Sequence, residues 1–126
     1  MNYYIYYWKY IEYIHGDLAP ETTKELDKDY AFVGTVHFPT SRRVNNIENL
    51  EKIFMHYNAD DNPLSTLEGQ EKLKALGVNH TSMSVGDIIQ FAGVTYIVDI
   101  IGFKEIKLDE WAQEHVLEAQ RMIGRI

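Results

Sequence analysis

The polar side chains best suited to catalysis or binding lie between His80 and Asp87, where the chain reads HTSMSVGD. The segment combines serine hydroxyls, a histidine and a carboxylate, which are the residue types of a nucleophile, its base and the acid that orients the base. Residues this close in sequence rarely reach the geometry of a catalytic triad, and the Gly-x-Ser-x-Gly elbow is missing. We therefore expect no catalytic residue, and the alternative is a small hydrolase-like enzyme that uses the His80–Asp87 turn.

The same turn has a structural and a functional interpretation. Serine and aspartate side chains hydrogen-bond nearby backbone N–H groups, and Gly86 permits a tight approach before a strand. Loops also carry binding residues, and here Ser82 and Ser84 would act as donors and Asp87 as an acceptor. We favour the structural interpretation and keep these three residues as candidate partner-binding residues.

A second group of candidates is a carboxylate stripe on the helix expected near the C-terminus. Its members follow one another at about four-residue spacing, which is about 6 Å along a helix. Adjacent DNA phosphates have a similar separation, so the stripe resembles the ligand of a protein that grips DNA. A solvated helix face that keeps the protein soluble explains the same pattern. The candidate partner-binding residues of the stripe are Asp109, Glu110, Glu114 and Glu118.

Metal and cofactor sites are not expected. The chain contains no cysteine, which excludes zinc and iron–sulfur sites built from thiolates. It contains five histidines, and no two of them show the i,i+4 spacing of a zinc-protease helix. We therefore predict neither a metal nor a cofactor.

The composition is that of an acidic protein with enough apolar residues for one core. Of 126 residues, 45% are hydrophobic, and 12 basic against 19 acidic residues leave a formal net charge of −7. The apolar content excludes a disordered chain, and the negative charge argues against direct binding to nucleic-acid backbones. No segment approaches the roughly 18–20 uncharged apolar residues of a membrane span, and the N-terminus is unlike a signal peptide. We expect one cytoplasmic domain over residues 1–126, in the host cytoplasm if a phage encodes it.

The strands that would position these candidates are predicted from residue type. Aromatic and β-branched residues favour strands, and they dominate four segments of the chain. Between the last two segments, Gly93 supplies the positive φ that a tight hairpin turn needs. The expected strands are residues 2–14, 30–38, 86–91 and 94–101.

The first of these segments is rich in tyrosine and has two interpretations. Its aromatic rings either pack on both faces of the strand in the core, or leave one face exposed as a contact surface. The second interpretation predicts a structural protein that forms a homodimer or larger oligomer through its tyrosine-rich N-terminus.

Apolar residues at three- and four-residue spacing predict two main helices, residues 46–57 and 107–123. A weaker helical stretch is expected over 64–76, with Gly77 as the residue that terminates it. A short helix is expected over 20–28. The expected fold is α+β, a small, mostly antiparallel sheet with the two main helices packed on one face. The stripe of the first main helix consists of Ile47, Leu50, Ile53, Phe54 and Tyr57.

Two segments in this order resemble a known family. They are NLEKIFMHYN at 49–58 and HTSMSVGDII at 80–89, followed by YIVD at 96–99 and GFKEI at 102–106. The arrangement is similar to the YodL-like domain of Firmicutes, phages and other mobile elements, over about residues 30–106. The stretch 64–77 departs from the family spacing as an insertion before the serine turn. The resemblance implies a small α+β domain without established chemistry.

The expected function is that of a non-enzymatic, acidic protein-binding module of a phage or mobile element. Its partner would be a host protein, and an inhibitor of a host defence or nucleic-acid-binding protein fits the carboxylate stripe. We expect no direct contact with nucleic acid and none with a membrane. The identity of the partner does not follow from the residues.

Overall fold

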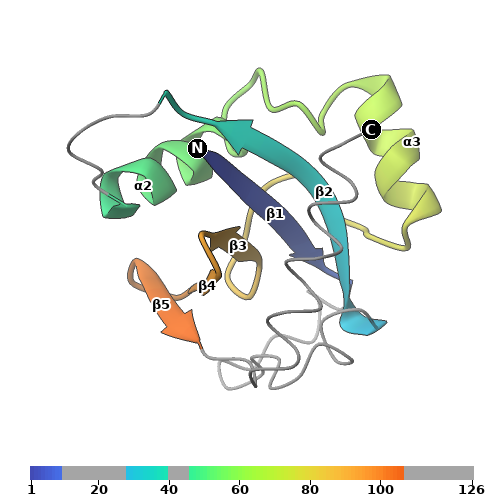
Figure 1. The fold of residues 1–126 in the computed structure, drawn as a ribbon. Helices are drawn as coiled ribbons and strands as arrows, with labels where there is room; N and C mark the ends of the chain where they lie inside the picture. Colours follow the sequence, from blue (N-terminus) through green and yellow to red (C-terminus); the bar gives the residue numbers. More distant parts are fainter. Residues whose placement is uncertain (10–27, 40–45, 107–126) are drawn as a thin grey trace.

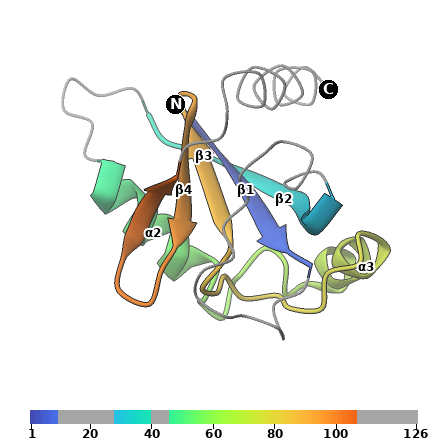
Figure 2. The same cartoon turned by 90° about the horizontal axis from the view of Figure 1, so that it is seen from below.

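The computed structural model describes residues 1–9, 28–39 and 46–106, whose strands form one five-stranded sheet. Their spatial order is β2-β1-β3-β4-β5, and every neighbouring pair is antiparallel (Figure 1). Two helices, α2 (Asn46–His56) and α3 (Leu67–Ala75), pack on the same side of the sheet (Figure 2). The predicted α+β fold is confirmed. The strands are β1 (Asn2–Trp8), β2 (Tyr30–His37), β3 (Ile88–Phe91), β4 (Val94–Val98) and β5 (Phe103–Ile106).

Three predicted segments lie wholly or largely outside the described residues. They are the second main helix at 107–123, the end of the first expected strand at 10–14, and most of the short helix at 20–28. The helix that joins α2 on the sheet in the described part is instead α3, which was predicted only as a weaker helical stretch. No helix among the described residues is long and apolar enough to cross a lipid bilayer.

β1 is an inner strand with buried side chains on both of its faces. Tyr3, Ile5 and Tyr7 are every second residue of β1, so their side chains all lie on the helix side of the sheet. All three are fully buried, which confirms core packing for these tyrosines. On the opposite face, Trp8 stacks on Tyr30 with the ring centroids 6.4 Å apart. β1 pairs with β2 along residues 2–8 on one edge and with β3 through Tyr4, Ile5 and Tyr6 on the other. The helix-side core also contains Leu50, Ile53, Tyr57, Leu64, Leu73, Met83 and Ile89.

The first turn of α2 departs from the predicted apolar stripe. Leu50 and Ile53 are buried as expected, but Ile47 is exposed. The reason lies in the hydroxyl of Tyr3, which donates to Asn46 Oδ1 at 2.8 Å and accepts from Asn49 Nδ2 at 3.1 Å. A buried tyrosine ring that ends in a hydroxyl requires polar partners. The asparagines of the first turn therefore face the sheet, and Ile47 is turned to the surface.

α3 packs into the main core and is not a peripheral helix inserted in a loop. Thr66 caps its first turn by accepting the Gly69 N–H at 3.0 Å. At the other end Gly77 has φ +77°, as predicted, and the Val78 N–H bonds to the Leu73 carbonyl at 2.9 Å. Leu73 and Val78 are both buried in the main core.

The predicted strand 94–101 is shorter in the structure than expected. β3 and β4 form the expected hairpin, with positive φ at Ala92 (51°) and Gly93 (81°). The return strand was predicted to reach residue 101, but β4 ends at Val98 and a turn over residues 99–102 leads into β5, which was not predicted. Gly102 has φ +71°, a conformation that favours glycine and closes this turn.

Candidate functional site

The Asp87 carboxylate is fully buried directly before β3 and is bonded on both oxygens. Oδ1 accepts the Trp8 N–H at 2.8 Å, and Oδ2 accepts the Ser84 N–H at 2.8 Å. The first bond ties the segment to the end of β1, and the second closes the turn that begins at Ser84. This is the structural role that the turn pattern predicted. The burial of Asp87 does not fit the alternative role as an acceptor for a partner's donors.

His80 completes this arrangement as a third neighbour of the carboxylate. Its Nε2 lies 3.0 Å from Asp87 Oδ2 and 3.2 Å from Oδ1, and its ring stacks on Tyr7 with centroids 4.6 Å apart. Burial raises the pKa of the Asp87 carboxyl, while the hydrogen bonds from His80, Trp8 and Ser84 act in the opposite direction. The close histidine–carboxylate contact is formed despite the short sequence spacing that argued against it.

Neither serine of the turn is bonded to this histidine. Ser82 is exposed, and the Ser84 hydroxyl donates to the Ser82 carbonyl at 3.3 Å. The second ring nitrogen of His80, Nδ1, is buried and has no hydrogen-bond partner within the described residues. A serine triad needs the hydroxyl on the nitrogen that faces away from the acid. The described residues therefore form a histidine–carboxylate pair in which neither Ser82 nor Ser84 is placed as a nucleophile.

Two tyrosine hydroxyls hold the segment 80–87 from the sheet side. Tyr7 donates to the Thr81 carbonyl at 2.9 Å, and Tyr30 donates to the Gly86 carbonyl at 2.7 Å. Burial, followed by the nearby Asp87 charge, raises the pKa of both tyrosines, so both remain protonated donors at neutral pH. These contacts tie both ends of the segment to the tyrosines of β1 and β2.

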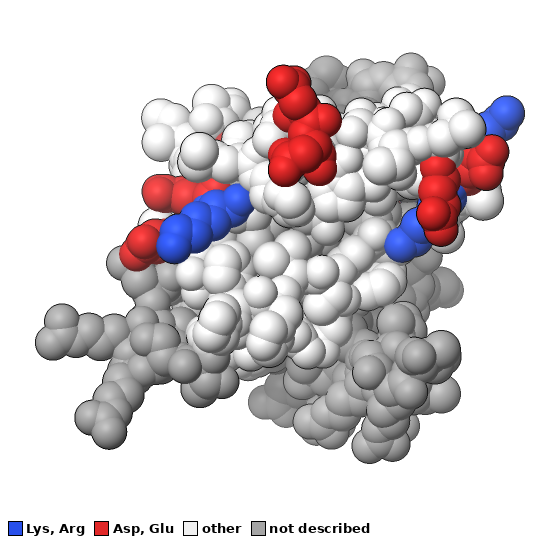
Figure 3. Space-filling view, turned by 90° about the horizontal axis from the view of Figure 1, so that it is seen from above, with Lys and Arg blue, Asp and Glu red and all other residues white. Residues whose placement is uncertain are grey.

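The charges of the described helices do not gather into one acidic face. In Figure 3, acidic and basic side chains stand together over α2 and over α3, and a separate acidic group without a basic neighbour stands on the surface between them. Glu48 and Lys52 pair at 3.4 Å along α2, with both side chains well exposed. Exposed pairs of this kind contribute little to stability. The predicted carboxylate stripe, Asp109, Glu110, Glu114 and Glu118, lies outside the described residues.

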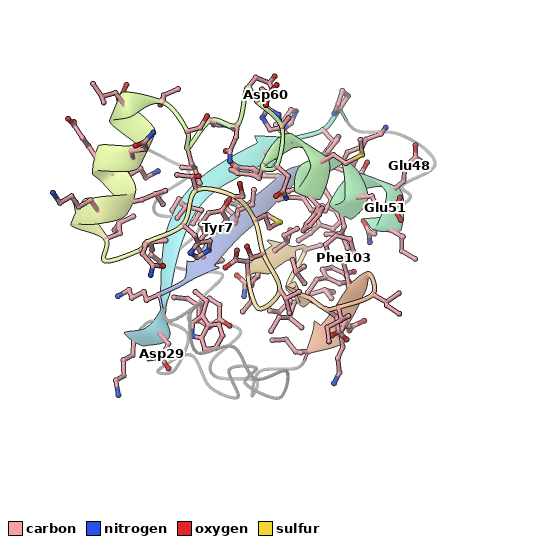
Figure 4. The ribbon with its side chains drawn as sticks, turned by 180° about the vertical axis from the view of Figure 1, so that it is seen from behind. Tyr7, Asp29, Glu48, Glu51, Asp60 and Phe103 are labelled. Carbon is pink, nitrogen blue, oxygen red and sulfur yellow. The ribbon has the colours of Figure 1, made fainter. Side chains whose placement is uncertain are left out.

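A surface that the sequence did not predict lies between α2 and the turn after β4. Met55, Ile100 and Ile101 are 70%, 80% and 91% exposed, and we call these three residues the apolar surface. Met55 and Ile100 border a hollow of about 360 Å³ that also contains Phe103. Figure 4 shows Phe103 extending from β5 toward α2, where its ring meets Phe54 edge-on at 6.4 Å.

The apolar surface was missed because residues 94–101 read as one continuous strand. Asp99 and Gly102 were the available signal, since both are turn formers and they flank the two isoleucines. In the structure the Asp99 side chain accepts the Ile100 N–H at 2.8 Å, and the Asp99 N–H donates to the Gly102 carbonyl at 2.9 Å. The turn projects both isoleucines into solvent.

Within the described ranges, no group of three histidine or carboxylate side chains is arranged to hold a metal ion. His37 and His56 are exposed on β2 and α2, and His80 is engaged with Asp87.

Comparison with known proteins adds one relative of viral origin. No protein-family model and no solved structure matches the chain. The uncharacterized protein R785 of Acanthamoeba polyphaga mimivirus is 36% identical over 93 residues, which cover 68% of this chain and 85% of that protein. The chain belongs to the same family as this mimivirus protein.

Proposed function

We propose that the protein is a non-enzymatic protein-binding module and that the apolar surface is its main contact site. The observation that carries this proposal is the exposure of Met55 and Ile100 on the rim of a hollow in the surface, with Ile101 exposed next to Ile100 in the same turn. Clustered exposed apolar side chains mark interaction sites, because burying each large side chain yields about 1.5–3 kcal/mol. Three such side chains in one place provide the centre of a specific protein interface.

The absence of catalysis in this proposal is supported by the burial of the polar atoms of the His80–Asp87 pair, although the His80 ring lines a hollow of about 350 Å³ together with Lys74 and Thr81. Asp87 is fully buried, and the free nitrogen of His80 is buried as well. A general base must come within hydrogen-bond reach of the proton that it abstracts. The pair is better suited to fixing the turn than to attacking a substrate.

We further propose that the protein is carried by a virus or mobile element and acts on a host protein. Its viral relative supports this setting. In this proposal the carboxylate stripe at 109–118 and the exposed Ser82 are secondary contacts, and inhibition of a host defence or nucleic-acid-binding protein is one role that such a module would serve.

Site-specific photocrosslinking in cells that naturally contain the protein tests the main contact. A benzophenone side chain is placed at Met55 or Ile101, with a control at Gln70, which is exposed on α3. We expect the same protein, identified by mass spectrometry, to be captured from Met55 and Ile101 and not from Gln70. An added Ile100→Ser substitution should abolish capture. Equal capture from Gln70, or capture that survives Ile100→Ser, would refute the proposed contact site.

A further inference from the structure

The charged residues around the apolar hollow are all acidic. Glu51 and Asp99 both line it, and among the residues that the structure describes no lysine, arginine or histidine does so. Glu51 lies one turn before Met55 on α2, and Asp99 directly precedes Ile100 in the opposite wall. Two carboxylates therefore flank the same apolar depression from two different elements.

Neither carboxylate is neutralised by a cation within the described residues. The nearby Lys52 pairs with Glu48 at 3.4 Å, and Glu51 and Asp99 make no ion pair there. Asp99 uses Oδ1 to accept the Ile100 N–H, which orients its carboxylate beside the hollow. Both carboxylates belong to exposed residues, so a partner's cation can reach them without a cost of burial.

The shape of this surface favours a helix as the incoming element. Ile47, Glu51 and Met55 follow at four-residue spacing along one side of α2, a length of about 12 Å or two helical turns. The hollow lies between this helix and the turn after β4, and it is lined by apolar side chains of both, Met55 and Ile100, together with Phe103. A helix laid in such a groove presents apolar anchors at i, i+3 or i+4, and i+7.

Building on the proposed function, we infer that the partner presents an amphipathic helix with Lys or Arg beside its apolar anchors. The anchors enter the hollow between Met55 and Ile100, and the cations lie against Glu51 and Asp99. Apolar contact supplies most of the affinity, and the two carboxylates select a basic helix over an acidic one.

Three synthetic 18-residue helical peptides test the inference with the full-length protein. The first has leucines on one face and lysines beside them, the second has glutamates in place of the lysines, and the third keeps the lysines but has glutamines in place of the leucines. Fluorescence anisotropy gives the affinities, and ¹H–¹⁵N NMR shifts locate the bound peptide. We expect the first peptide alone to bind well and to shift Met55, Ile100 and Phe103.

Substitutions in the protein separate charge selection from apolar contact. Glu51→Gln with Asp99→Asn should weaken binding of the first peptide between about twofold and 30-fold and reduce its salt dependence. The matched control, Glu68→Gln with Glu71→Gln, removes two exposed carboxylates from α3 and should change the affinity little. Met55→Ser with Ile100→Ser should abolish binding.

The outcomes distinguish this inference from the proposal on which it rests. If the lysine and glutamate peptides bind equally and only Met55→Ser with Ile100→Ser weakens them, the apolar contact stands and the basic partner is refuted. If the α3 control weakens binding as much as Glu51→Gln with Asp99→Asn, the attraction is general and the inference also fails. If no peptide binds, or if the apolar substitutions have no effect, the docking site itself is overturned.

Discussion

Replacing Asp87 with asparagine tests whether its carboxylate organises the segment 80–87. The carboxylate accepts hydrogen bonds from two backbone N–H groups, those of Trp8 and Ser84, and contacts His80 Nε2. Asparagine has nearly the same shape but only one acceptor oxygen, and its NH₂ group must face at least one of the present donors. The substitution therefore creates a buried clash of donors without creating a cavity.

The expected cost follows from the number of donors left without an acceptor. One unsatisfied buried donor costs about 1–3 kcal/mol, and hydrogen bonds to charged groups are stronger than neutral ones. Removing the desolvated charge, whose burial raises the pKa of Asp87, offsets part of this loss. We expect Asp87→Asn to lower the free energy of unfolding by about 2–4 kcal/mol, a large share of the roughly 5–15 kcal/mol typical of a domain.

Urea unfolding, followed by circular dichroism, measures this change, and Asp61→Asn is the matched control because Asp61 is exposed. Hydrogen exchange adds a local readout, since the Trp8 and Ser84 amides should lose protection in Asp87→Asn more than other amides of the sheet. If Asp87→Asn unfolds within about 0.5 kcal/mol of the parent, as surface substitutions do, the carboxylate does not organise the segment.

Three further predictions concern the turns and the buried tyrosines. Ala92 has φ 51°, so Ala92→Asn should stabilise the protein by about 0.5–1 kcal/mol, seen as a higher Tm, and a lower Tm would contradict the strain inferred there. A Cβ on Gly34 would lie 2.7 Å from the Tyr57 hydroxyl, so Gly34→Ala should cost about 1–3 kcal/mol. Most of that cost should vanish in a Tyr57→Phe background, and strictly additive urea midpoints would argue against the contact. Burial raises the pKa of Tyr7, Tyr30 and Tyr57, so the folded state retains protons that the unfolded state releases above about pH 10. Stability is therefore intact below that pH and should fall by up to about 4 kcal/mol per pH unit above it, with tyrosinate absorbance at 295 nm rising together with unfolding.

The sheet and the first main helix followed from local patterns because both depend on side-chain periodicity. The hairpin at Ala92–Gly93 and the glycine end of α3 were predictable because each needs a positive φ. α3 itself was underestimated, since its core contacts through Leu73 come from a sparse apolar pattern. With so few apolar residues in α3, its packing on the sheet can be recognised only once the positions of the strands are known.

The errors at the candidate sites have tertiary causes. Ile47 fits the apolar stripe of its helix, but the Tyr3 hydroxyl attracts the neighbouring asparagines and so rotates that turn. The His80–Asp87 contact depends on the end of β1, because the Trp8 N–H and the Tyr7 ring hold the two side chains from a strand about 75 residues away in sequence. No local pattern contains that information.

The rigidity of the turn after β4 bears on how a partner would bind. Ile100 and Ile101 are exposed because two hydrogen bonds of Asp99 and the left-handed Gly102 fix the backbone between β4 and β5. Association is weakened by the ordering of interface groups, and a surface that is already ordered avoids part of that cost. Apolar side chains held outward by such a turn have no competing internal site in which to pack. The exposure of this surface is therefore built into the fold, which is the property expected of a preformed contact site.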